Sequence, residues 1–204
     1  MDRRGQFAAI LALTAAPFCR ADGISEGDRS YALSALHASR KQLLDATSGL
    51  SRTQWRYKPA PDAWSIAEIV EHLALLEEQF PKILAEAMKT PAAPDRKLKN
   101  ARAADEKILA MLPDRSRKAQ APEQFKPSGK FKDGPAAVAA FKAARERVLE
   151  SMRKTQEPLR EHFYQHPALG DLDAYQWYLM VAGHTERHVN QMLEVKASPG
   201  FPKK

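Results

Sequence analysis

WSIAEIVEHLALLEEQF occupies residues 64–80 and has the pattern of a long amphipathic helix. Ser65 with Glu68 three positions later forms a capping box, which marks a helix start. Apolar residues then recur at helical spacing, at Ile66, Ile69, Val70, Leu73, Leu76 and Phe80. His72 lies three positions after Ile69 and four before Leu76. The segment therefore predicts a buried helix that carries a histidine on its inner face.

Three further segments show helical periodicity, and 204 residues suit a single domain. We expect a first helix within Ser25–Leu50, a third from Pro135 to Met152, and a last from Asp171 to Lys196. Pro81 should kink the second helix without ending it, because apolar spacing resumes at Ile83.

The region Thr90–Gly134 between the second and third helices is rich in Pro and Lys, with one short helix expected around residues 103–112. No alternating strand pattern competes with the helices. The prediction is an all-α four-helix bundle over residues 25–196, with a long crossover connection between helices 2 and 3 and a short tail at 197–204.

The last helix carries His184 and His188, which are four residues apart and share one face. Its expected buried face is Tyr178, Val181, His184, His188, Gln191 and Val195. Each histidine alone could be a hydrogen-bonded core residue, or the pair could lie on the surface. Because all three histidines fall on inward stripes, where an unpartnered imidazole costs roughly a few kcal/mol, the sequence favours one metal ion bound by His72, His184 and His188.

Other titratable residues near these positions carry weaker signals. His162 and His166 have the same spacing as the pair above but lie beside Pro167 in an expected turn, so we expect a structural or exposed role for them. His37 in the first helix could approach the inner face as a fourth contact. Glu71 and Glu186 neighbour the histidines in sequence and should point away from them. No His-Glu-x-x-His motif is present, and no general base can be named.

The ligand types restrict the metal. The single cysteine, Cys19, lies near the N-terminus, so the domain offers neither a disulfide nor a thiolate ligand. Three neutral imidazoles with an open position suit a divalent transition metal, zinc or nickel ahead of iron or cobalt, and do not suit calcium or magnesium. Such an ion could activate water or orient a thiol or carbonyl group.

The formal charge of +7 and the pI near 9.5 raise the possibility of a nucleic-acid partner. Basic residues are, however, interspersed with acids, as in Arg145-Glu146-Arg147, which is typical of a solvated helix surface. The locally basic stretches 96–102 and 115–132 contain few aromatic residues for base stacking. We therefore expect no nucleic-acid partner. The expected substrate is a small molecule of unknown identity, and the sequence is compatible with a homodimer.

The N-terminal segment differs from the rest of the chain. Arg3 and Arg4 precede a short apolar run at residues 7–16, as in a secretory signal. We expect residues 1–21 to be a signal peptide that is cleaved after Ala21, giving an exported protein, periplasmic or extracellular, without stable membrane insertion. The alternative is an apolar helix that packs on the domain of a cytoplasmic protein.

Four motifs together resemble the DinB-like superfamily: WSIAEIVEHL at 64–73, FKP at 125–127 with AFKAAR at 140–145, HPALG at 166–170, and HTERHVNQ at 184–191. The resemblance covers roughly Ser30 to Lys196. It implies a four-helix bundle of up-down-down-up topology and a divalent metal at three histidines, which map onto His72, His184 and His188. Gln191 also matches the pattern and should support the site from one turn further along.

The resemblance also implies a class of function. Characterised relatives include bacillithiol- and mycothiol-dependent transferases and a mycothiol-dependent isomerase, so we expect a metal-dependent enzyme, transferase or hydrolase. The alternative is a non-enzymatic metal-binding or helical binding module. Because such thiols are chiefly intracellular, the signal-like start favours a hydrolase or a binding protein over a thiol-dependent transferase.

Overall fold

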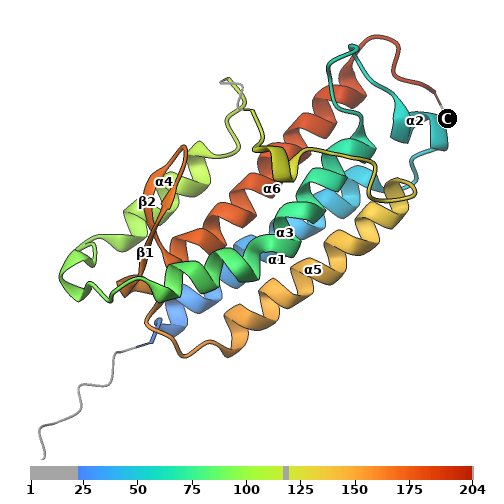
Figure 1. The fold of residues 1–204 in the computed structure, drawn as a ribbon. Coiled ribbons are helices and arrows are strands. Elements are labelled where there is room, and N and C mark those ends of the chain that lie inside the picture. Colours follow the sequence, from blue (N-terminus) through green and yellow to red (C-terminus); the bar gives the residue numbers. More distant parts are fainter. Residues whose placement is uncertain (1–22, 117–119, 204) are drawn as a thin grey trace, which may run out of the picture.

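Four long helices form the bundle in the computed structural model (Figure 1). They are α1 (Glu26–Thr47), α3 (Ile66–Lys89), α5 (Gly134–Lys154) and α6 (Ala174–Ala197). The structure describes residues 23–116 and 120–203, so the signal-peptide prediction for 1–21 lies outside the described residues. Within these ranges no helix is both long and apolar enough to cross a membrane.

The chain direction confirms the predicted topology. In Figure 1, α1 and α6 run one way along the bundle while α3 and α5 run the other way, which gives up-down-down-up. α3 packs against α5, and α1 packs against α6. The crossover from α3 to α5 contains η1 (Pro94–Arg96), α4 (Ala101–Met111) and η2 (Glu123–Phe125). α4 lies along α6, so the crossover spans the bundle instead of closing a tight turn.

The two helices that carry the histidines begin at capping boxes. Ser65 Oγ accepts a hydrogen bond from the Glu68 amide at 3.3 Å, and Glu68 returns a bond to the Ser65 amide at 2.7 Å. Asp173 and Gln176 make the same reciprocal pair at the start of α6. Pro81 lies inside α3, which continues to Lys89, as predicted. These caps satisfy the free N–H groups at the helix starts and fix where each helix begins.

A β-hairpin precedes α6 where the sequence predicted only a turn. β1 (Phe163–His166) pairs antiparallel with β2 (Gly170–Asp173), and the expected helix start at Asp171 is therefore wrong by three residues. Strands of four residues are too short to show an alternation of apolar and polar residues in the sequence. Gly170, with a left-handed φ of +76°, allows the turn between the two strands. The indole N–H of Trp177 donates to the Tyr164 carbonyl at 3.2 Å, which ties the hairpin to α6.

A short helix, α2 (Arg52–Arg56), fills the connection between α1 and α3. Its Trp55 is buried against the start of α5, where a Cβ on Gly134 would lie 2.2 Å from the indole ring. Glycine is therefore the residue that this contact requires.

Arg145 is completely buried, so the expectation that Arg145-Glu146-Arg147 forms a solvated surface is wrong for its first residue. All five of its N–H groups have acceptors. Nε and Nη2 donate to Glu77 Oε1 on α3, and Nη1 donates to the Leu36 carbonyl and Ser39 Oγ on α1. Nη2 also donates to Thr185 Oγ1 on α6 at 2.8 Å. One guanidinium on α5 thus binds the other three long helices.

A second buried ion cluster anchors the crossover at the end of the bundle where α1 and α6 begin. Arg160, in η3 (Leu159–Glu161), forms a bidentate pair with Asp105 of α4 at 2.9 and 2.6 Å. It also contacts Asp28 of α1 and Asp173, the N-cap of α6. Burial raises the pKa of Asp173 to about 6, although Arg160 opposes this shift. The cluster fixes α4 relative to the start of α6.

We predict that Arg145→Ala lowers the free energy of unfolding by about 3–5 kcal/mol, because it leaves Glu77 buried without its partner. Burial already raises the pKa of Glu77, and only Arg145 opposes this. Urea denaturation gives the measurement. The neighbouring Arg147→Ala, at an exposed position, should change stability by less than about 0.5 kcal/mol. The double variant Glu77→Met/Arg145→Leu should recover most of the loss, and equal effects of Arg145→Ala and Arg147→Ala would contradict the prediction.

Candidate metal centre

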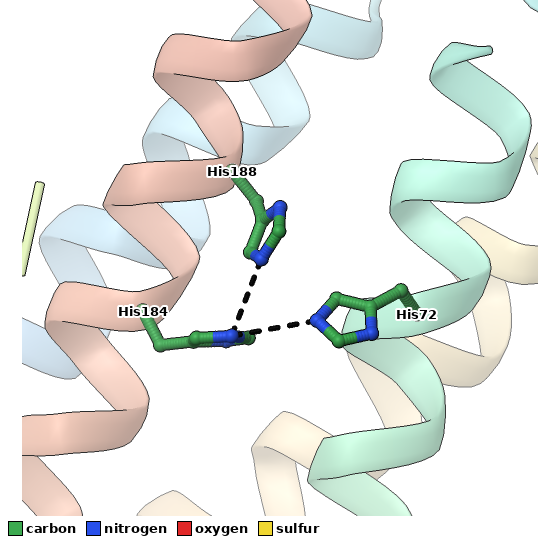
Figure 2. Close-up of side chains that lie close together, drawn as sticks. All are labelled: His72, His184 and His188. Atoms are coloured by element: carbon green, nitrogen blue, oxygen red, sulfur yellow. Dashed lines mark hydrogen bonds between the residues drawn. The ribbon is translucent and has the colours of Figure 1, made fainter. Parts of the chain in front are cut away.

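The structure brings together the three histidines that the sequence selected. His72 on α3 and His184 and His188 on α6 point toward one another across the space between the two helices (Figure 2). His184 Nε2 lies 3.4 Å from His72 Nε2 and 3.2 Å from His188 Nε2. One nitrogen from each ring lies within 4.8 Å of the others. One small ion could therefore contact all three.

Hydrogen bonds on the far side of two rings fix their tautomers. His72 Nδ1 donates to the Phe125 carbonyl at 2.7 Å, and His188 Nδ1 donates to Gln191 Oε1 at 2.8 Å. Because a carbonyl oxygen can only accept, both protons are on Nδ1 and both Nε2 atoms present lone pairs. A metal-binding histidine commonly donates its other N–H to a carbonyl or carboxylate in this way.

The centre has unsatisfied polarity that a cation would remove. The two lone pairs converge on His184 Nε2, which can supply at most one proton to one of them. At least one of the two lone pairs, on His72 Nε2 or His188 Nε2, therefore receives no proton from the trio. An unpaired buried polar group costs roughly 1–3 kcal/mol. The donor set therefore fits a metal ion better than it fits a self-contained hydrogen-bond network.

Burial keeps the three imidazoles in the neutral form that binds metals. It lowers the pKa of His72, against the opposing effect of the Phe125 hydrogen bond. It lowers the pKa of His184 and His188 much further, and the neighbouring histidines add to the shift. All three rings are therefore neutral at pH 7, and no deprotonation is required before an ion binds.

Trp64 covers one side of the centre. Its ring centroid lies 5.1 Å from that of His72 and 6.3 Å from that of His188, nearly parallel to the latter at 22°. His72 is only 3% exposed and His188 only 8%. The packed indole restricts both rings and limits their contact with water.

The remaining candidates lie elsewhere. His37 is exposed on α1, whose inner face is formed by Ala32, Leu36, Ser39 and Leu43, so the expectation that it could reach the centre is wrong. His162 Nδ1 donates to the Thr90 carbonyl, and His166 Nδ1 accepts from the amides of Ala168 and Leu169. Both histidines therefore make hydrogen bonds to the backbone away from the centre, where we expected a structural or exposed role.

The acidic neighbours of the histidines are engaged in other contacts. Glu71 accepts hydrogen bonds from the amides of Ser128 and Lys130, and Glu186 lines a groove with Tyr31 and Leu109 between α1 and α4. Among the described residues, the metal-binding group consists of three histidines without a carboxylate. Neutral nitrogen ligands suit zinc, nickel, cobalt or iron.

Gln191 contacts His188 as expected, whereas the Phe125 carbonyl and Trp64 were not predicted as neighbours of the ligands. The Phe125 carbonyl belongs to the backbone and has no residue signature. Trp64 lay in the first motif, and its position one turn before Glu68 and two turns before His72 would have been the available signal.

Comparison with known proteins agrees with this architecture. Residues 35–192 match the DinB superfamily. The uncharacterised protein YuaE of Bacillus subtilis (strain 168) is 28% identical over 164 residues, which cover 80% of this chain and 96% of that protein.

Two solved structures are similar in fold. TT2238, described as a four-helix bundle protein, is 21% identical with a TM-score of 0.50, covering 81% of this chain and 98% of that one. YfiT from Bacillus subtilis, described as a probable metal-dependent hydrolase with an unusual four-helix bundle topology, is 14% identical with a TM-score of 0.49, covering 85% and 88%. Because the sequence match extends over most of the bundle and includes all three histidines, the chain belongs to the DinB superfamily.

Proposed function

We propose that the protein is a metal-dependent enzyme, a hydrolase or transferase, that acts on a small molecule with a divalent transition metal bound by His72, His184 and His188. The observation that carries the proposal is the convergence of three Nε2 atoms, two of them with their lone pairs fixed toward the common point. An ion held there would act as a Lewis acid and lower the pKa of a bound water.

The surrounding residues have defined roles in this proposal. The Phe125 carbonyl and Gln191 hold the rings of His72 and His188 in the required orientation. Trp64 packs on the same two rings and reduces the water around them. A dry, rigid environment strengthens electrostatic interactions with a bound substrate.

Hydrolysis is favoured over transfer to a thiol by the N-terminal sequence. If residues 1–21 direct export, as predicted, the mature protein works where low-molecular-weight thiols are scarce. Water is the nucleophile available in either compartment.

A non-enzymatic metal-binding module is the second candidate, and the burial of two of the three candidate ligands favours it. With His72 3% and His188 8% exposed, an ion here could have a structural role. The two candidates differ in whether the ion keeps a position that an external ligand can occupy.

We predict one divalent ion per chain in protein loaded with zinc or nickel and then dialysed, measured by elemental analysis. His188→Ala should lower the affinity for the metal at least about 10-fold. Loss of an outer hydrogen-bond partner of a ligand lowers metal affinity about 10–100-fold, and loss of the ligand itself should cost more. His37→Ala, on an exposed helix face, is the matched control and should bind like the wild type. A wild-type protein that retains no ion would disprove the proposed function.

We predict that azide changes the visible absorption spectrum of the cobalt-substituted protein, because three protein ligands leave a position open. The same metal should restore turnover in a screen of ester, amide and thiol-transfer substrates. A spectrum that azide does not change, together with no metal-dependent turnover, would favour the structural module instead.

We predict that the metal-free protein loses stability as the pH falls below about 6.5. The three histidines have folded pKa values below the unfolded value, so the unfolded state binds more protons in this window and stability decreases. Asp173, with its raised pKa of about 6, has the opposite sign.

Urea unfolding at pH 7.5 and pH 5.5 should therefore be compared with that of a His184→Gln/His188→Gln variant, which removes most of the histidine effect and keeps that of Asp173. The wild type should lose more stability than the variant between the two pH values. Equal losses would show that burial of the histidines does not control the pH dependence.

A further inference from the structure

Residues 123–131 of the crossover, which we call the strap, contact the helix that carries His72. Figure 1 shows η2, at the start of the strap, in front of α3 and α6. The Phe125 carbonyl at the end of η2 accepts the Nδ1–H of His72 at 2.7 Å. The strap therefore makes a direct polar contact with a candidate ligand.

A second contact holds the strap at the residue next to His72. Glu71 is 5% exposed, and its Oε1 accepts hydrogen bonds from the amides of Ser128 and Lys130, both at 2.9 Å. Gly129, between these two amides, has a left-handed φ of +78°. Successive amides in such a turn form a concave anion-binding nest, and hydrogen bonds to a carboxylate are stronger than neutral ones.

Metal binding and strap closure require the same state of His72. To donate to Phe125, the ring must carry its proton on Nδ1, which leaves the Nε2 lone pair toward His184. A metal at Nε2 requires that same tautomer. Two events that favour one state stabilise each other, and the coupling is reciprocal.

We propose that Glu71 is a positioning residue that latches the strap over the metal centre, so that strap closure and metal binding at His72 are coupled. The inference rests on the proposed metal site and adds its regulation. The latch acts on the side of His72, which is 3% exposed, while His184 stays partly exposed.

Two variants weaken the latch in independent ways. Glu71→Gln removes the charge and keeps one acceptor, and Gly129→Ala strains the turn. An added Cβ on Gly129 meets nothing within 4 Å, so the strain is confined to the backbone. Gly170→Ala is the matched control, because its φ is +76° and its Cβ also meets nothing within 4 Å, but it lies in the β-hairpin.

The first measurement is the affinity for cobalt or nickel, followed by tryptophan fluorescence, since Trp64 lies against two ligand rings. Both latch variants should raise the dissociation constant about 10-fold or more, which is the usual effect of losing an outer partner of a ligand. Gly170→Ala should stay within about 2-fold of the wild type. If the latch only stabilises the fold, all three substitutions should lower the unfolding midpoint, and the three variants should bind the metal with equal affinity.

The second measurement is amide hydrogen exchange with and without the metal. In the wild type the metal should slow exchange at Ser128 and Lys130, and in Glu71→Gln this protection should be reduced by the same factor as the affinity. If the wild type binds metal and both latch variants bind it with the same affinity, the coupling is disproved while the proposed function stands. Wild-type protein that binds no metal would overturn the proposed function itself.

Discussion

The buried Arg145 guanidinium is the contact on which the geometry of the bundle depends. Its five N–H groups bind acceptors on α1, α3 and α6 from a position on α5. A buried charge is tolerated only when it is paired and fully hydrogen-bonded, so the four helices can meet in few relative orientations. One acceptor, Thr185, directly follows His184 on α6, and another, Glu77, lies on the same helix as His72. Arg145 therefore links α3, through Glu77, to α6, through Thr185, close to the helix positions that carry the histidines.

The centre that results is held from both sides of the His72 and His188 rings. Packing places the Nε2 atoms at a common point, while the Phe125 carbonyl and Gln191 set two Nδ1 protons on the outside. Burial keeps the rings neutral and makes their unsatisfied lone pairs costly, and a cation at the common point would satisfy these lone pairs. Membership of the DinB superfamily accounts for the scaffold, and the proposed chemistry follows from these local contacts.

The long crossover connects the scaffold to the centre. Arg160 anchors α4 through the bidentate pair with Asp105. The strap then supplies the backbone carbonyl that orients His72 and is held by the carboxylate of the adjacent Glu71. Ile108 of α4 belongs to the core, while the strap contacts His72 and Glu71 through backbone carbonyl and amide groups.

The sequence alone determined the four long helices, the capping box at Ser65 and the inward position of His72, His184 and His188. These features are encoded by residues three or four positions apart, which share a helix face whatever the helix packs against. Tertiary structure alone decided that Arg145 is buried while Arg147 is exposed, that His37 faces outward, and that the Phe125 carbonyl meets His72. The contacts of Arg145 and of the Phe125 carbonyl depend on partners 50 or more positions away in the chain. The outward position of His37 depends on which face of its helix packs inward. Every residue has a backbone carbonyl, so the sequence does not mark the one that meets His72. Local periodicity therefore determined which histidines lie on the inner helix faces. Only the packing of α3, α5 and α6 placed these histidines close enough together to contact one ion.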